Sequence, residues 1–196
     1  MEIVIVVFAY LLGSVPVGYI LGARAGIDVR KAGSGNIGAT NVARVIGKRQ
    51  GIATLIADAL KGFIPVFIAG HLSLGSRAMA LAGAAAFLGH LYPVFLGFHG
   101  GKGVATALGV FLGLAPLTTL FLIIIFAAAM LATRIVSLSS MIAAAAAPIM
   151  LWVFSYPPDV IGTGAFLAFM IVWRHRANIK RLAEGAEPRF GASSRL

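Results

Sequence analysis

Apolar runs separated by short polar segments dominate this chain. A helix needs roughly 20 apolar residues to cross a hydrocarbon layer about 30 Å thick, and most of the runs have about that length. They predict an all-α fold, a polytopic membrane helix bundle. The runs are rich in Leu, Ile, Val, Ala and Phe and cover residues 3–22, 51–71, 77–97, 103–133, 136–155 and 159–173.

The run 103–133 is too long for one ordinary span and too short for two. Ala115-Pro116 interrupts it, and a proline lacks the amide hydrogen and biases the preceding residue away from the helix. We therefore expect a short helix over 103–114 and a full one over 116–133. The count becomes seven transmembrane helices, and whether the short one crosses fully stays open.

The basic residues favour seven helices with the N-terminus outside and the C-terminus cytoplasmic. This arrangement leaves only Arg77 outside, with Lys61 inside a span, whereas six helices would move Arg134 and the basic tail to the other face. The positive-inside rule selects seven. The fourteen basic residues predicted inside are Arg24, Arg30, Lys31, Arg44, Lys48, Arg49, Lys102, Arg134, Arg174, Arg176, Lys180, Arg181, Arg189 and Arg195.

Composition agrees with a lipid-facing surface. The chain is 60% hydrophobic and 11% charged, against about 25% charged in soluble domains. Its net charge of +10 does not indicate nucleic acid, because the basic residues lie between apolar runs. No cysteine is present, which excludes disulfides and thiolate metal sites. Met1 to Ile5 lack a basic segment, so we expect no cleaved signal peptide and one membrane domain over 1–196.

The first polar segment, 28–44, contains a match to the dinucleotide-binding pattern G-x-G-x-x-G at residues 33–38. That fingerprint requires a preceding strand, and a membrane helix precedes it here, so we reject a Rossmann fold. Glycines still let backbone amides approach an anion, and a helix beginning near Thr40 directs its dipole toward it. A flexible connector is the alternative. The predicted phosphate cradle comprises Ser34, Gly35, Asn36, Gly38, Thr40, Asn41 and Arg44.

The second polar segment places glycines on both sides of one lysine at the start of a helix. It is not a Walker A loop, because its first glycine is one residue too close and Gly103 replaces the metal-binding Ser or Thr. We therefore predict phosphate binding without a nucleotide. His90, near the inner end of the preceding span, is either a packing histidine or part of the site. The candidate residues here are His90, Gly100, Gly101, Lys102, Gly103 and Thr106.

The third polar segment, 173–188, is basic and carries His175. On a helix, His175 and Asn178 share one face, as do Arg174, Asn178 and Arg181. The alternative is a basic anchor beside the membrane.

Two charged residues, Asp58 and Lys61, lie three positions apart within the second apolar run. A lone charge at mid-bilayer costs about 3 kcal/mol or more, so we expect them to pair. A structural ion pair and a part of the site are both open.

Together these segments resemble the bacterial acyl-phosphate–glycerol-3-phosphate acyltransferase family over nearly the whole chain. Residues 33–44 are similar to its first motif, and 89–95 with 100–106 to its second. Residues 178–182 with Gly185 to Pro188 are similar to its third, and Arg134 to Ser140 resemble another family signature. The His-x-x-x-x-Asp motif of better-known acyltransferases is absent.

The resemblance implies transfer of a fatty acyl group from acyl phosphate to the first hydroxyl of glycerol 3-phosphate. Lysophosphatidic acid and phosphate would be the products, at the opening of phospholipid synthesis, without acyl-CoA or acyl carrier protein as direct donor. An acyl-phosphate-forming enzyme would supply the donor. The implied location is the bacterial inner membrane, with the site at its cytoplasmic face among membrane lipid.

For this reaction we expect Arg44 and Lys102 to hold phosphate charge, with the first loop completing the cradle. His175, Asn178 and Glu187 would position glycerol 3-phosphate, with Arg181 beside them. Direct attack by the glycerol hydroxyl is preferred, and its proton goes to the donor's phosphate, to His90 or to His175. No cofactor is expected, and the six scattered acidic residues predict no dedicated metal site. An anion transporter and a lipid-binding scaffold are the competing classes.

Overall fold

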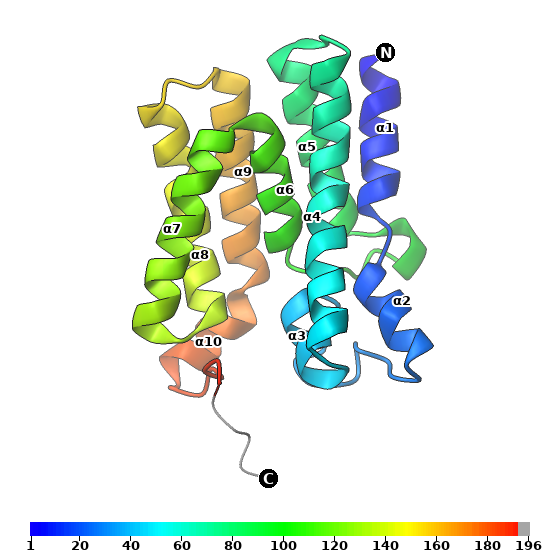
Figure 1. The fold of residues 1–196 in the computed structure, drawn as a ribbon, viewed down its shortest axis with the longest axis vertical. Helices are drawn as coiled ribbons and strands as arrows, with labels where there is room; N and C mark the ends of the chain where they lie inside the picture. Colours follow the sequence, from blue (N-terminus) through cyan, green and yellow to red (C-terminus); the bar gives the residue numbers. More distant parts are fainter. Residues whose placement is uncertain (192–196) are drawn as a thin grey trace. The chain divides into compact units, whose positions relative to one another are not determined.

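A computed structural model describes residues 1–191, and within them the chain is helical without strands (Figure 1). The chain forms two compact units, Met1–Leu114 and Ala115–Leu196. Arg195, one of the basic residues predicted inside, lies outside the described residues. The first unit contains α1 (Glu2–Gly13), α2 (Val17–Arg24), α3 (Ala39–Val45), α4 (Lys48–His71), α5 (Gly75–Leu91), the 3-10 helix η1 (Val94–Leu96) and α6 (Val104–Leu114). The second contains α7 (Pro116–Thr133), α8 (Val136–Val153), α9 (Pro158–Arg174) and α10 (Arg176–Ala183).

Five helical segments of the described residues are long and apolar enough to cross a membrane. They are Glu2–Arg24, Lys48–His71, Gly75–Leu96, Pro116–Thr133 and Val136–Val153. The apolar helix α6 has 11 residues, about 16 Å at 1.5 Å per residue, and α9 has 17 residues. The helix boundary predicted at Pro116 is confirmed, because α6 ends at Leu114 and α7 begins at Pro116. The polytopic all-helical class is therefore correct.

The first apolar run, predicted as one uninterrupted span, is interrupted. It forms α1 and α2, with Ser14 to Pro16 between them. Pro16 has no amide hydrogen to continue the helical ladder, and the Ser14 hydroxyl donates to the Tyr10 carbonyl over 2.8 Å. The interruption leaves the Val15 carbonyl close to α4, where Lys61 reaches it.

Close packing of α4 on α6 organises the first unit, and small residues permit it (Figure 1). A Cβ added at Gly62 would overlap the backbone of Thr106, and one added at Gly109 would overlap the backbone of Ala59. The α1 and α5 helices approach in the same way, with Gly13 against the backbone of Ala86. Small residues at such contacts are typical of membrane helices, which gain little from hydrophobic burial in lipid.

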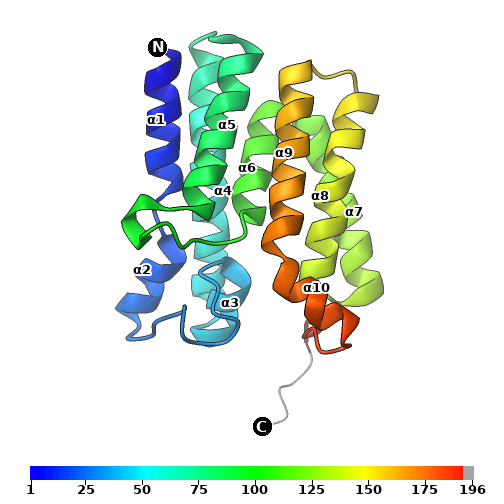
Figure 2. The ribbon, with the colours of Figure 1, turned by 180° about the vertical axis from the view of Figure 1, so that it is seen from behind.

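In the second unit, α8 packs against both α7 and α9. Figure 2 shows α10 following α9 at the end of the unit where α7 and α8 are joined. A hydrogen bond fixes this end, because the Phe190 amide donates to the Arg134 carbonyl over 2.6 Å. The third polar segment is therefore attached to the start of α8.

Candidate active site

The first polar loop is folded around the side chain of Asn41. Its Nδ2 lies 3.0 Å from the Val29 carbonyl, 3.0 Å from the Ala32 carbonyl and 2.8 Å from the Asn36 carbonyl. Its Oδ1 accepts the Ser34 amide over 2.8 Å, and the residue is 2% exposed. All its polar atoms thus hold the loop together. Asn41 thus has a structural role in the loop, and its contact with phosphate stays a prediction.

Other backbone amides of this loop are also engaged internally. The Gly35 amide donates to the Ala32 carbonyl over 3.1 Å, and the Gly38 amide donates to Asn36 Oδ1 over 2.7 Å. Together with the Ser34 amide they shape the loop, and phosphate binding at Gly35 and Gly38 stays a prediction. The positive φ of Gly35, 70°, is the conformation that the turn requires.

Three polar side chains of the predicted cradle stay exposed: Ser34, Thr40 and Arg44. Thr40 and Arg44 lie four residues apart on α3 and therefore on one face. The predicted helix start near Thr40 is confirmed, since α3 begins at Ala39. The hydroxyls of Ser34 and Thr40 and the guanidinium of Arg44 are suited to bind an anionic oxygen group.

Arg30 of the same loop is engaged elsewhere. Its Nε and Nη2 each lie 2.9 Å from a carboxylate oxygen of Asp28, and its guanidinium lies 4.5 Å from the centre of the Tyr19 ring. The side-chain hydrogen bonds from Arg30 lower the pKa of Asp28 to about 2. Arg44 is consequently the better candidate for a cationic ligand of phosphate.

The second polar loop is fastened to the end of α5. The Gly100 amide donates to the Leu91 carbonyl and the Gly101 amide donates to the His90 carbonyl, each over 3.1 Å. These two amides cap the last turn of α5, and phosphate binding at Gly100 and Gly101 stays a prediction. Gly103 has φ +82°, and a Cβ there would overlap the Phe87 ring. The loop's glycines thus serve close packing and leave Lys102 as its cationic group.

Thr106 lies away from the loop surface. It is fully buried in the contact of α6 with α4, where its backbone faces Gly62. Thr106 therefore has a packing role, and its contribution to phosphate binding stays a prediction.

The first and second loops meet within the first unit. Leu96 of η1 packs against the buried cluster of Val29, Ile37 and Val42. This cluster holds the 29–37 loop on α3, so η1, which leads into the second loop, packs on the apolar support of the first loop.

His90 and the intramembrane charges come together beneath the second loop. Asp58 Oδ1 lies 2.8 Å from Lys61 Nζ and 3.7 Å from His90 Nδ1. The predicted pairing of Asp58 with Lys61 is confirmed, and its connection to His90 was not anticipated, because it joins helices that are distant in sequence.

The third polar segment is an ordered structure that continues from α9. His175 lies between α9 and α10, is 3% exposed, and its Nδ1 lies 2.7 Å from the Ile171 carbonyl. A carbonyl only accepts, so Nδ1 carries the proton and Nε2 is the basic nitrogen of the neutral ring. Asn178 and Arg181 share a face of α10, as predicted, whereas Arg174 belongs to α9.

Glu187 accepts three hydrogen bonds: from Ser137 Oγ over 2.7 Å, Asn178 Nδ2 over 2.5 Å and Arg181 Nε over 2.7 Å. Burial raises the pKa of Glu187, and these three bonds lower it more, so the net pKa lies below the usual 4.5. Protein donors thus occupy both carboxylate oxygens. Glu187 therefore organises the segment, and its contact with substrate stays a prediction.

The end of α10 brings Glu187 back to these donors. The Ala186 amide donates to the Arg181 carbonyl over 2.7 Å and the Gly185 amide to the Leu182 carbonyl over 3.1 Å. With Gly185 at φ +67°, these are the paired bonds of a Schellman motif. Ser137, which was not among the predicted site residues, lies in the polar signature at the start of α8.

These observations define a class: an integral membrane protein with apolar helices and basic, glycine-rich loops held by internal hydrogen bonds. The family model for glycerol-3-phosphate acyltransferase matches residues 3–185. The glycerol-3-phosphate acyltransferase of Geobacter sulfurreducens is 49% identical over 97% of this chain and 98% of its own length. The same enzyme of Geobacter metallireducens is 54% identical with the same coverage of each chain.

Solved structures agree with this match. The chain resembles PlsY (YgiH), an integral membrane glycerol 3-phosphate acyltransferase, in its glycerol 3-phosphate form with a TM-score of 0.94. That similarity is at 45% identity and covers 97% of this chain and 96% of the other. The lysophosphatidic acid form gives a TM-score of 0.91 at 44% identity, covering 97% and 95%.

The chain belongs to the glycerol-3-phosphate acyltransferase family, as its motifs predicted. It is an acyltransferase of lipid biosynthesis and an integral membrane protein.

Proposed function

We propose that this protein transfers a fatty acyl group from acyl phosphate to the sn-1 hydroxyl of glycerol 3-phosphate. The products are lysophosphatidic acid and inorganic phosphate, and the reaction opens phospholipid synthesis. One observation carries the acceptor: the similar solved structures are a glycerol 3-phosphate form and a lysophosphatidic acid form. These two molecules differ by one acyl ester, so they are related as acceptor and product.

Acyl phosphate suits the chemistry of this chain as donor. Its carbonyl is already activated, since phosphate is a good leaving group. The chain has no cysteine and no G-x-S-x-G sequence, so it offers no persuasive covalent nucleophile. We propose that the glycerol oxygen attacks the carbonyl directly. A new C–O ester bond forms, the C–O bond to phosphate breaks, and the hydroxyl proton passes to the released phosphate.

We assign Arg44 and Lys102 to the phosphate charges of the substrates, because a cation near the leaving phosphate stabilises charge that develops during transfer. Ser34 and Thr40 add hydroxyl donors at the exposed surface of the first loop. Asn36 is a supporting residue of the same loop, since its side chain holds the Gly38 amide. Orientation of both substrates then supplies most of the rate enhancement.

His175 and Asn178 are proposed to position glycerol 3-phosphate. Because His175 Nδ1 is held by the Ile171 carbonyl, Nε2 is the nitrogen suited to accept a hydrogen bond from the attacking hydroxyl. Asn178 is oriented by Glu187, and Arg181 is oriented by the same carboxylate. This makes His175 the alternative proton acceptor to the substrate's own phosphate.

We also propose seven spans, with the N-terminus outside, and an active site at the cytoplasmic face of the bacterial inner membrane. The five long segments, α6 and α9 together supply seven, and the positive-inside rule sets the orientation. Chain 1–196 is proposed to act as one domain, with acyl phosphate supplied by an enzyme that forms it.

Purified protein tests the reaction directly. With acyl phosphate and glycerol 3-phosphate in detergent, we expect one phosphate released for each lysophosphatidic acid formed. Acyl-CoA or acyl carrier protein in place of acyl phosphate is expected to give no product. Product from acyl-CoA alone would overturn the donor assignment, and anion flux in liposomes without phosphate release would favour a transporter.

A further inference from the structure

The ion pair of Asp58 with Lys61 is buried in the first unit, with 3% and 5% of the two side chains exposed. Transfer of such a pair out of water is costly, and a neutral pair of similar shape is often as stable or more so. The pair therefore calls for an explanation other than stability. Each partner also makes a second contact. Lys61 contacts the first span and Asp58 contacts α5.

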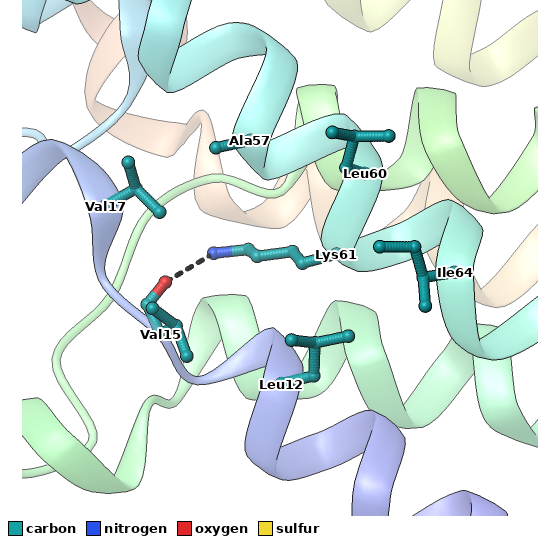
Figure 3. A pocket seen from close by; sticks show the side chains of 7 residues that line it. All are labelled: Leu12, Val15, Val17, Ala57, Leu60, Lys61 and Ile64. Carbon is teal, nitrogen blue, oxygen red and sulfur yellow. Dashed lines mark hydrogen bonds between the residues drawn. The ribbon is translucent and has the colours of Figure 1, made fainter.

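Lys61 reaches toward the interruption of the first span. Its Nζ donates to the Val15 carbonyl over 3.0 Å, in a pocket that Leu12 and Val17 also line (Figure 3). This carbonyl lies just before Pro16, where the helix is broken. Lys61 thus satisfies a carbonyl at the break and is held in place by the same bond.

Asp58 reaches toward α5. Its Oδ1, held by Lys61, lies 3.7 Å from His90 Nδ1. At this distance a carboxylate attracts an imidazole N–H electrostatically, although the contact is longer than a hydrogen bond. His90 is 4% exposed, so little solvent weakens the attraction.

The His90 ring supports the second loop. A Cβ at Gly101 would overlap this ring, so the loop backbone lies directly on the imidazole. The Gly101 amide also donates to the His90 carbonyl over 3.1 Å. Gly101 precedes Lys102, and a shift of the ring would therefore move the backbone that carries the proposed phosphate ligand.

We propose that Asp58 and Lys61 are positioning residues, which orient His90 and thereby fix the Gly100–Gly103 loop. The pair links the interruption at Val15 to the loop that presents Lys102. This inference rests on the proposed function for its effect on turnover, because Lys102 is there assigned to a substrate phosphate. Its effect on the loop itself does not depend on that assignment.

The double variant Asp58→Asn/Lys61→Met tests the proposal, because it removes both charges and leaves no unpaired one. Thr54→Val is the matched control: it deletes the 2.8 Å hydrogen bond from a buried residue to the Gln50 carbonyl in the same helix. Three quantities are measured in detergent: the melting temperature, hydrogen exchange of the peptide 99–104, and kcat and KM for both substrates.

We expect the double variant to fold, with loop exchange faster and kcat/KM lower by about 10- to 100-fold. The KM of the substrate bound by Lys102 rises, while Thr54→Val leaves loop exchange and both constants unchanged. Gly101→Ala, which displaces the ring without touching the charges, is expected to have the same effect on the loop.

Unchanged loop exchange and unchanged kcat/KM in the double variant would overturn the positioning role. Failure of the double variant to fold would also overturn it, because the ion pair would then be required for folding. If wild-type protein shows no transfer from acyl phosphate, the proposed function fails, and loop exchange still decides this inference.

Discussion

The side-chain amide of Asn178 donates to Glu187 Oε1 over 2.5 Å, and this bond joins α10 to the segment that follows it. Ser137 Oγ, at the start of α8, donates to the same oxygen. Glu187 thus connects the beginning of α8 to the face of α10 that carries two predicted site residues. A carboxylate with these donors is suited to orient Asn178 rather than to contact an anionic substrate.

Replacement of Glu187 by Gln tests this organising role. The amide loses the ion pair with Arg181 and directs N–H groups toward donors. We expect the free energy of unfolding to fall by about 1–3 kcal/mol and turnover to fall with it. Thermal unfolding in detergent measures the effect. Glu184→Gln is the control, because Glu184 is exposed and lies 4.0 Å from Lys180; an equal loss in that variant would contradict the role of Glu187.

The pH dependence of stability follows from the same carboxylate. Because the pKa of folded Glu187 lies below 4.5, its contribution is complete above the unfolded pKa, near 4.5, and is lost as pH falls through the folded pKa. We therefore expect the difference in melting temperature between wild type and Glu187→Gln to be constant above that pH and to shrink below it. A difference that grows on acidification would contradict the lowered pKa of Glu187.

Asn41→Ala is expected to release the first loop. It removes four hydrogen-bonded contacts of a buried side chain, and the unsatisfied carbonyls cost about 2 kcal/mol or more. Hydrogen exchange of residues 29–41 is expected to accelerate and activity to be lost. The α5 peptides serve as internal control. If exchange in the loop stays at its wild-type rate, Asn41 does not hold it.

Gly109→Ala tests the close approach of α4 and α6. The added methyl would overlap the backbone of Ala59, which has no flexible end to move aside. Overpacking of this kind costs about 1–3 kcal/mol. Gly162→Ala in α9 is the control, since a Cβ there has no neighbour within 4 Å. We expect a lower melting temperature for the first variant alone, and equal melting temperatures would contradict the packing described.

The sequence predicted most helices because apolar length and prolines act locally. Pro116 marked the start of α7, and the Asp58–Lys61 pair followed from the spacing of charges on one helix. The interruption at Pro16 was missed because the apolar run continues across it. The partners of Asn41 and Glu187 were missed for another reason. The sequence shows that these side chains are polar, but only the folded chain shows which donors and acceptors lie beside them.

The most direct test of the proposed catalytic site is the rate of phosphate release in Arg44→Ala and Lys102→Ala. The substrates are acyl phosphate and glycerol 3-phosphate. Both residues are assigned to charge that develops during transfer, so we expect each loss to lower turnover by about 10²–10³-fold at an unchanged melting temperature. Arg49→Ala, an exposed arginine in the first turn of α4, is expected to keep the wild-type rate. Near-normal rates in both Arg44→Ala and Lys102→Ala would contradict the site.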